Sequence, residues 1–396
     1  MNDRIAITGI GIVSALGLNV EENLIALKQG KSGIKPIRIL DTVHKNDFLV
    51  GEVPFTDNEL AKMLNIGDAN NWTRTSLLGL MAAREAWINS GITFEKSKNG
   101  IVSATTVAGM RKTEQFYGDF ISNRISEEFI ETHDAGDSTE KIADNLGIKD
   151  YITTVSTACS SSVNSIMLGA RLLKNKVVDK VLVGGVDSLS RFTLNGFNSL
   201  MILDKNACRS FDENRAGLNL GEGAAYLVLE RESDVKNRAI LAFVLGYANA
   251  NDAFHQTASS PDGKGAALAM QKSLKMANIN PEDINYINAH GTATSNNDLS
   301  EGLAIQYVFR NNLPKISSTK PFTGHTLGAA GAIEAVFSVL SLRNQTIFPN
   351  LNFKTQMKEL DFKPVDKLLE NIELNYVLSN SFGFGGNNSS IIFANN

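Results

Sequence analysis

A single cysteine stands where an extended segment passes into a helical one. In ITTVSTACSSSVNSIMLGARLLKN, residues 152–175, the β-branched residues 152–155 predict a strand, and apolar residues recur every three or four positions over 163–173, which predicts a helix. Cys159 therefore falls near the first turn of that helix, where unpaired N–H groups and the positive dipole end favour a thiolate. The alternative is a buried, inert cysteine, which is the commoner role of this residue type.

Two histidines occupy comparable places later in the chain. His290 follows a predicted strand in NAHGTATSNND, and His325 precedes a predicted helix in STKPFTGHTLGAAGAIEA. Either one alone would be an ordinary structural histidine, but together with Cys159 they suit acyl transfer through a thioester. The competing interpretation is a zinc site with three ligands. Because no two of these residues form a closely spaced ligand pair, we expect no metal.

The chain has two glycine-rich segments that resemble functional loops, and only one of them remains a candidate. The loop SFGFGG, residues 381–386, has the backbone freedom to change shape, and its N–H groups could face an oxyanion; the alternative is a plain turn before the last strand. The segment TGIGIVSALG, residues 8–17, is not a dinucleotide-binding G-x-G-x-x-G motif, because Ser14 stands at the last glycine position.

Composition excludes several classes of protein. The chain has 396 residues, of which 43% are hydrophobic and 20% charged, and its net charge of −4 gives no overall attraction to nucleic acid or anionic lipid. Two cysteines make neither a disulfide framework nor a zinc cluster, and we find neither an N-terminal leader nor a membrane-spanning stretch. We therefore expect a cytoplasmic protein without nucleic-acid or membrane partners.

Strand and helix signals alternate twice in the same order, which predicts a duplicated α/β unit with halves at 1–238 and 239–396. The first half has predicted strands at 5–12, 100–105, 152–155, 180–188 and 221–230, and helices at 77–90 and 163–173. The second half has predicted strands at 239–248, 284–291, 314–319, 375–385 and 388–395, and helices at 266–277 and 328–342. The first half also carries a longer insertion at 107–150.

Two of these helices have no polar face. Residues 328–342 are apolar almost all round, and residues 163–173 are nearly so, which is typical of helices enclosed between layers. Two such helices between two sheets predict a five-layered α/β/α/β/α body. In that arrangement the strand ends and helix starts that carry Cys159, His290 and His325 converge on one pocket.

Four segments now identify a family. STACSSS, NAHGTAT, STKPFTGHTLGAAGAIEA and NSFGFGGNN resemble, in this order, the active-site segments of the β-ketoacyl-acyl-carrier-protein synthases of the elongating Cys–His–His class. The resemblance covers essentially the whole chain. It implies the thiolase-like fold, a homodimer, and decarboxylative Claisen condensation of malonyl-carrier with an acyl chain in fatty-acid or related chain elongation. It implies no cofactor, because phosphopantetheine arrives on the acyl carrier protein.

The resemblance also implies roles for particular residues. Cys159 would accept the acyl chain, and His290 and His325 would stabilise the enolate formed when malonyl thioester loses carbon dioxide. Further roles are a supporting charged pair (Lys320, Glu334), an oxyanion hole (the N–H groups of Cys159 and Phe384), a gate (Phe384 with Gly383), phosphopantetheine binding (Thr292, Thr294) and the acyl pocket (Val107). We expect Pro321 to hold Lys320 extended, and Glu334, in an apolar helix, to need a buried partner.

Three basic residues are candidates for contacts with the carrier protein. The stretch before the helix at 77–90 offers only Arg74, with Lys62 upstream, and Arg209 is a further plausible carrier contact. RAGLNLGEGAA also differs from the form common in housekeeping fatty-acid enzymes. A ketosynthase of a specialised polyene or polyketide pathway with a dedicated carrier is therefore an alternative, whereas Cys159 argues against a non-catalytic chain-length partner subunit.

Two related enzyme classes fit less well. A thiolase would use a second cysteine as base, and the only other one, Cys208, lies outside the four segments. The initiating synthases combine cysteine with histidine and asparagine, whereas this chain has a second histidine, His325.

Overall fold

The protein is a duplicated α/β body built on one ten-stranded sheet. The computed structural model describes residues 3–92, 97–124 and 127–395. The first half contributes β1 (Ile5–Ser14), β4 (Asn99–Ala104), β5 (Tyr151–Val155), β6 (Lys180–Asp187) and β7 (Gly223–Arg231). The second half contributes β8 (Ala242–Asn251), β9 (Tyr286–Asn288), β10 (Lys315–Ser317), β11 (Tyr376–Gly383) and β12 (Asn387–Ala394). The short strands β2 (Lys35–Pro36) and β3 (Leu49–Val50) pair separately.

The strand order demonstrates the duplication. In space the first half runs β1-β7-β6-β4-β5, and the second half runs β8-β12-β11-β9-β10, with the same order and connections. Where we expected two separate sheets, β1 and β8 pair antiparallel over three residues and join the halves. Over these three residues the pairing covers strand edges that separate sheets would leave exposed at the centre of the molecule.

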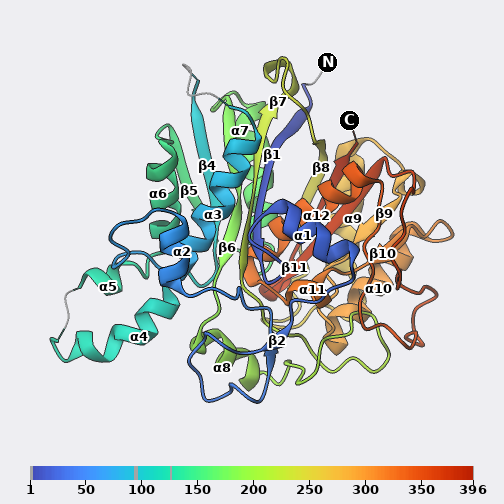
Figure 1. The fold of residues 1–396 in the computed structure, drawn as a ribbon. Coiled ribbons are helices and arrows are strands. Elements are labelled where there is room, and N and C mark those ends of the chain that lie inside the picture. The colour runs from blue at the N-terminus through green and yellow to red at the C-terminus, as the bar shows by residue number, and fades with distance from the viewer. Residues whose placement is uncertain (1–2, 93–96, 125–126, 396) are drawn as a thin grey trace.

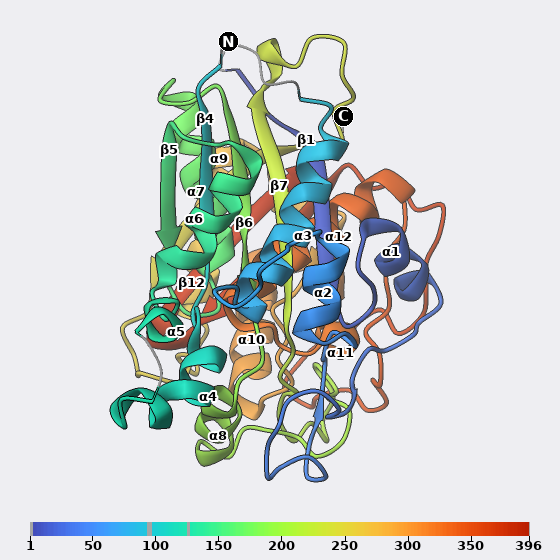
Figure 2. The ribbon, with the colours of Figure 1, turned by 60° about the vertical axis from the view of Figure 1, so that its left-hand side comes forward.

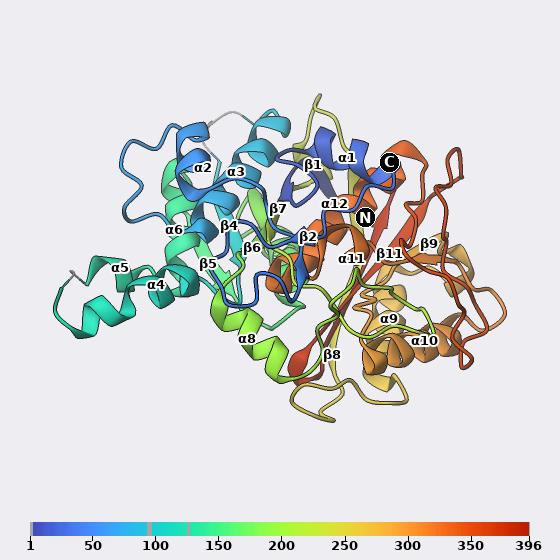
Figure 3. The ribbon, with the colours of Figure 1, turned by 60° about the horizontal axis from the view of Figure 1, so that its bottom comes forward.

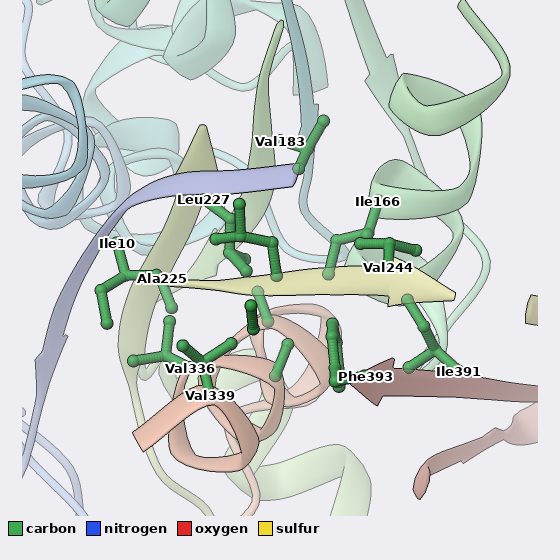
Figure 4. Close-up of a cluster of buried hydrophobic side chains, with 14 of the residues drawn as sticks. Ile10, Ile166, Val183, Ala225, Leu227, Val244, Val336, Val339, Ile391 and Phe393 are labelled. Carbon is green, nitrogen blue, oxygen red and sulfur yellow. The ribbon is translucent and has the colours of Figure 1, made fainter. Parts of the chain in front are cut away.

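Helices complete the five predicted layers (Figures 1 and 2). The central helices α7 (Ser161–Lys174) and α12 (Ala330–Asn344) contact each other and strands of both halves, while α3 (Arg74–Asn89) with α6 (Ala135–Leu146) and α9 (Lys264–Ala277) with α10 (Ser295–Phe309) cover the outer faces. In Figure 4, Ile166 of α7 and Val336 of α12 lie in a cluster that also includes residues of both half-sheets. All residues of α12 from 330 to 342 are buried, which explains its lack of a polar face.

Helix α10 was not predicted from the sequence. Its buried positions include Asp298 and Glu301, and these carboxylates interrupt the apolar pattern by which a buried helix is recognised. The remaining helices are α1 (Val20–Lys28), α2 (Asp57–Met63), α4 (Met110–Ile121), α5 (Glu128–Glu131), α8 (Arg191–Ser199) and α11 (Lys320–Thr323). Among the described residues, no helix is both long enough and apolar enough to cross a membrane.

The insertion forms a projecting arm. In Figures 1 and 3, α4 and α5 extend away from the layered body, whereas α6, at the end of the insertion, packs on it. No residue of α4 or α5 is buried, although Tyr117 and Ile121 are large and apolar. The body carries the candidate chemistry, and the arm presents apolar side chains to its surroundings.

Candidate active site

The three residues singled out in the sequence meet in the buried centre of the molecule. The side-chain ligand atoms of Cys159, His290 and His325 all lie within 4.8 Å of one another. His325 Nε2 is 3.1 Å from Cys159 Sγ, and the two imidazole rings meet edge to face, with centroids 5.3 Å apart. The predicted convergence of the two halves is therefore confirmed.

Cys159 sits in a strained turn just before α7. Ala158 has a left-handed backbone (φ 53°), which an L-residue with a side chain rarely adopts, and Ser160 is the residue that caps the helix. Burial raises the pKa of the Cys159 thiol to about 11, although the Lys320 ammonium and the Phe384 N–H act in the opposite direction. At the resting site desolvation therefore acts against the thiolate that the helix start favours.

His325 is held as a neutral hydrogen-bond donor. Its Nδ1 accepts the Leu327 N–H at 3.3 Å, so the ring proton belongs on Nε2, which faces Cys159 Sγ. Burial, followed by the neighbouring Lys320 ammonium, lowers the pKa of His325 well below its usual value. The imidazole can thus donate to a negative charge without becoming charged itself.

His290 has the same proton arrangement for a different reason. Lys320 Nζ lies 3.1 Å from its Nδ1, and an ammonium only donates, so the ring proton again belongs on Nε2. Burial, Lys320 and His325 lower the pKa of His290 well below its usual value. Two neutral imidazoles therefore offer Nε2–H donors in one cavity.

The predicted charged pair forms. Lys320 is bonded to Glu334, and both side chains are at most 3% exposed, so Glu334 has the buried partner it needs. Burial raises the pKa of Glu334 to about 7, opposed by Lys320. The prediction that Lys320 is extended is wrong: it begins α11, where the Glu334 contact and a Gly324 N–H bond to its carbonyl outweigh the steric preference before Pro321.

These proton positions bear on the zinc alternative. A metal ion needs a lone pair on each imidazole, yet in both rings Nδ1 already accepts a hydrogen bond and Nε2 carries the proton. The Lys320 ammonium would also repel a cation. The chemistry of this donor set suits an incoming anion better than a metal.

Two buried carboxylates that hold the histidine segments were missed from the sequence. Glu301, on α10, accepts the N–H groups of His290 and Gly291 at 2.9 and 2.8 Å, and burial raises its pKa to about 7. Asp187 ends β6 and accepts the Gly328 N–H at 2.7 Å, three residues beyond His325. For Asp187 the available signal was the one used for Glu334, an acidic residue next to an apolar stretch, whereas Glu301 stands among polar residues and offers no such signal.

A cavity of about 230 Å³ opens onto the three residues. The predicted substrate-binding residues Thr292, Thr294, Gly383 and Phe384 line it. Phe197 of α8, missed from the sequence, also lines it and stacks on Phe384, with ring centroids 5.7 Å apart and planes 17° from parallel.

Val107 does not line this cavity. It packs in a neighbouring apolar cluster with Leu189, Leu218 and Leu327, and its N–H donates to Asp187. Leu218 of the same cluster lines the cavity, and the assignment of Val107 to the acyl pocket stays a prediction.

The glycine loop is held in place by its neighbours. Gly385 and Gly386 have φ values of 76° and 74°, where a side chain would be strained. The Gly385 N–H donates to the Gln256 carbonyl, and Asn251 Nδ2 donates to the Gly385 carbonyl, both at 2.7 Å. The gate and oxyanion roles of Phe384 stay predictions.

Of the three predicted carrier contacts, one is wrong. The Arg74 side chain is 0% exposed and donates to the carboxylates of Glu222 and Asp57, because the first turn of α3 faces the protein interior. Lys62, in the last turn of α2, is exposed, and Arg209 is half-buried. Their contacts with a carrier stay predictions.

Comparisons with known proteins agree with this geometry. Residues 2–235 match the β-ketoacyl synthase N-terminal domain, and residues 241–354 match the β-ketoacyl synthase C-terminal domain. Similar curated proteins include the 3-oxoacyl-[acyl-carrier-protein] synthases 2 of Staphylococcus aureus (strain COL), 32% identical, and of Coxiella burnetii, 33% identical. Each match covers 99% of this chain and 98% of the relative.

Solved structures extend the comparison. The ishigamide ketosynthase/chain length factor is 30% identical with a TM-score of 0.94, and both chains are covered completely. The ketosynthase ApeO, in complex with its chain length factor ApeC from Xenorhabdus doucetiae, is 31% identical with a TM-score of 0.87; this match covers all of this chain and 98% of that one. The chain belongs to the β-ketoacyl synthase family of thiolase-fold condensing enzymes, which are acyltransferases.

Proposed function

We propose that this β-ketoacyl synthase holds the growing acyl chain as a thioester on Cys159 and extends it with a malonyl unit delivered on acyl carrier protein. The observation that carries the proposal is the pair of neutral Nε2–H donors beside Cys159. The phosphopantetheine arm arrives with the carrier, so the reaction needs no cofactor of its own. Thr292 and Thr294, whose hydroxyls are 2.9 Å apart in the cavity, would bind that arm.

In the first half-reaction the Cys159 sulfur attacks the acyl thioester. In the net reaction the thiol proton passes to the departing phosphopantetheine sulfur, which leaves as a thiol, and the chain remains on Sγ. Because burial keeps Cys159 protonated at rest, proton loss must accompany attack. The N–H groups of Cys159 and Phe384 would stabilise the tetrahedral oxyanion.

In the second half-reaction the malonyl carboxylate leaves as carbon dioxide, and its bonding electrons form an enolate on the thioester. The Nε2–H groups of His290 and His325 would donate to this enolate oxygen. The enolate carbon attacks the Cys159 thioester, and the cysteine leaves as a thiolate that is reprotonated. Carbon–carbon bond formation thus needs no strong base.

Mass spectrometry of the acyl-enzyme tests the proposal. Wild-type protein is mixed with a panel of acyl-carrier thioesters without malonyl donor, and the mass added to the peptide containing Cys159 is measured. Cys208→Ala is the matched control, because Cys208 is also buried but lies outside the cavity. Chain length and saturation of the preferred donor also separate fatty-acid elongation from a specialised pathway. Absence of acyl mass on Cys159 with every donor would contradict the proposal.

We also propose that the enzyme works as a dimer. Strand β5 is an edge of the sheet, and its Ile152 is 41% exposed. The nearby arm exposes the apolar side chains of Tyr117 and Ile121. An unpaired strand edge beside exposed apolar side chains is the kind of surface that a second chain covers. A homodimer is our first candidate. The similar ketosynthases paired with chain length factors support a second one, a heterodimer in a specialised pathway. Light scattering of the purified chain distinguishes them, since a monomer would contradict the homodimer.

A further inference from the structure

Asp187 is a buried carboxylate whose five donors come from two separate segments. Its oxygens accept the N–H groups of Thr106, Val107 and Gly328 and the hydroxyls of Thr105 and Thr106, at 2.6 to 3.2 Å. The residue is 0% exposed. A carboxylate satisfied in this way is firmly fixed, because any movement would leave several buried donors unpaired.

The two oxygens have different partners. Oδ1 accepts from Thr105, Thr106 and Val107, at the end of β4, whereas Oδ2 accepts from Thr106 and from Gly328, in the turn after His325. Asp187 thus joins the segment 105–107 to the segment 326–328.

The turn after His325 is strained and closely packed. Leu327 has φ 52°, and its N–H is the donor that places the His325 ring proton on Nε2. A Cβ added at Gly328 would lie 2.8 Å from Asp187 Oδ2 and 2.9 Å from Thr106 Cγ2. Only glycine lets the turn approach the carboxylate this closely, and the Gly328–Asp187 bond holds Leu327 where its N–H reaches the imidazole.

We propose that Asp187 is a positioning residue for His325: by holding the 326–328 turn, it keeps the imidazole as the Nε2–H donor aimed at the reacting thioester. The proposal rests on the donor role of His325 in the proposed function. Asp187 acts through the turn and does not itself contact substrate.

The main test is a double-mutant cycle with Asp187→Asn and His325→Ala. Asp187→Asn should lower the rate of malonyl decarboxylation by about 10- to 100-fold, the usual cost of removing a group that orients a functional histidine. The rate of Cys159 loading should fall less. In the His325→Ala background the same change should cost less than about twofold, because the group it positions is gone. An equal loss in both backgrounds would overturn the proposal.

The histidine itself gives an independent readout. In ¹⁵N-histidine-labelled protein, the Nδ1 of His325 should resonate as an unprotonated ring nitrogen in the wild type and shift towards the protonated position in Asp187→Asn. An unchanged spectrum would contradict the proposal. If His325→Ala leaves decarboxylation intact, the proposed function fails, whereas the nitrogen shift still tests the link from Asp187 to the ring.

Further variants distinguish a local effect on His325 from a general loss of folding. Glu230→Gln alters another fully buried carboxylate, at the opposite end of β7 from the site, and should leave the His325 spectrum and decarboxylation unchanged. If Asp187→Asn does not fold, Gly328→Ala and Thr105→Val replace it. Gly328→Ala disturbs the Oδ2 bond and should mimic Asp187→Asn. Thr105→Val removes one Oδ1 bond and the bond that Thr105 Oγ1 accepts from the Ala108 N–H, leaves the Oδ2 bond to Gly328, and should have the smaller effect on decarboxylation. Equal effects would overturn the proposal.

Discussion

The turns before α7 and α12 occupy equivalent places in the two halves but carry different chemistry. Each contains a non-glycine residue in the left-handed region, Ala158 with φ 53° and Leu327 with φ 52°. The first turn presents a thiol, and the second presents an imidazole whose proton position is set by that turn's own N–H. Duplication therefore supplies two strained turns that meet at one point, and the residue in each decides whether it provides the nucleophile or a donor.

The surroundings of the two turns differ in charge. Lys320 and Glu334 lie beside the histidines in the second half, and the Lys320 ammonium contributes to lowering the pKa of both imidazoles. At Cys159 the same ammonium opposes burial but does not overcome it. Burial lowers the pKa of both imidazoles with the help of this cation, whereas at Cys159 burial raises the pKa against it, which separates the roles of the two halves.

The largest expected effect comes from removing the nucleophile. Cys159→Ala should lower condensation by about 10³-fold or more, since the covalent intermediate can no longer form. Circular dichroism should show an intact fold, and Cys208→Ala should retain activity. Condensation near the wild-type rate in Cys159→Ala would show that Cys159 is not the nucleophile.

Removing a donor should act on the other half-reaction. His290→Ala and His325→Ala should each slow malonyl decarboxylation by about 10²–10³-fold, the usual consequence of losing one preorganised donor to an oxyanion. Loading of Cys159, followed by mass spectrometry, should fall less. Equal losses in both half-reactions would mean that the histidines serve the cysteine instead.

The resting thiol can be titrated directly. With a pKa of about 11, the thiolate fraction of Cys159 should rise roughly tenfold per pH unit, so iodoacetamide alkylation should rise about 100-fold between pH 7 and 9. The measurement uses Cys208→Ala protein, so that one thiol reacts. A rate that levels off below pH 8 would show a stabilised thiolate and restore the helix-start interpretation.

A smaller effect is expected at the glycine loop. Phe384→Ala should release carbon dioxide faster than it forms β-ketoacyl product, because an open gate admits malonyl carrier before the acyl chain is loaded. Its backbone N–H remains. Phe197→Ala, which removes the stacked partner, should raise the same ratio less. If the ratio of carbon dioxide to β-ketoacyl product and the loading rate both equal the wild-type values in both variants, the loop is a fixed turn and Phe384 is not a gate.

The smallest effect concerns metal. Treatment with a strong chelator should leave the condensation rate unchanged, since both imidazoles act as donors through Nε2–H. The rate before and after dialysis against chelator checks this, with readdition of zinc as the control. A loss that zinc restores would favour the three-ligand alternative.

The sequence predicted those parts of the fold and site that depend on local pattern. Apolar residues all round 328–342 identified a helix between layers, and the passage from a β-branched segment to a helical stripe placed Cys159 in a turn before a helix. The missed helix α10 and the missed Glu301 share one cause. Glu301 is satisfied by N–H groups of the turn after β9, which lies outside its own helix, and such partners leave no pattern within the helix.

The sequence alone determined the residue types, the order of the two repeats and the family. Only the tertiary structure decided their electrostatic state and accessibility. Arg74 looks like a surface cation and is enclosed with Glu222, Val107 packs in a buried apolar cluster, and burial raises the pKa of the Cys159 thiol. The physical reason is common to all three: desolvation and distant partners depend on how the layers pack, and packing is a property of the whole chain.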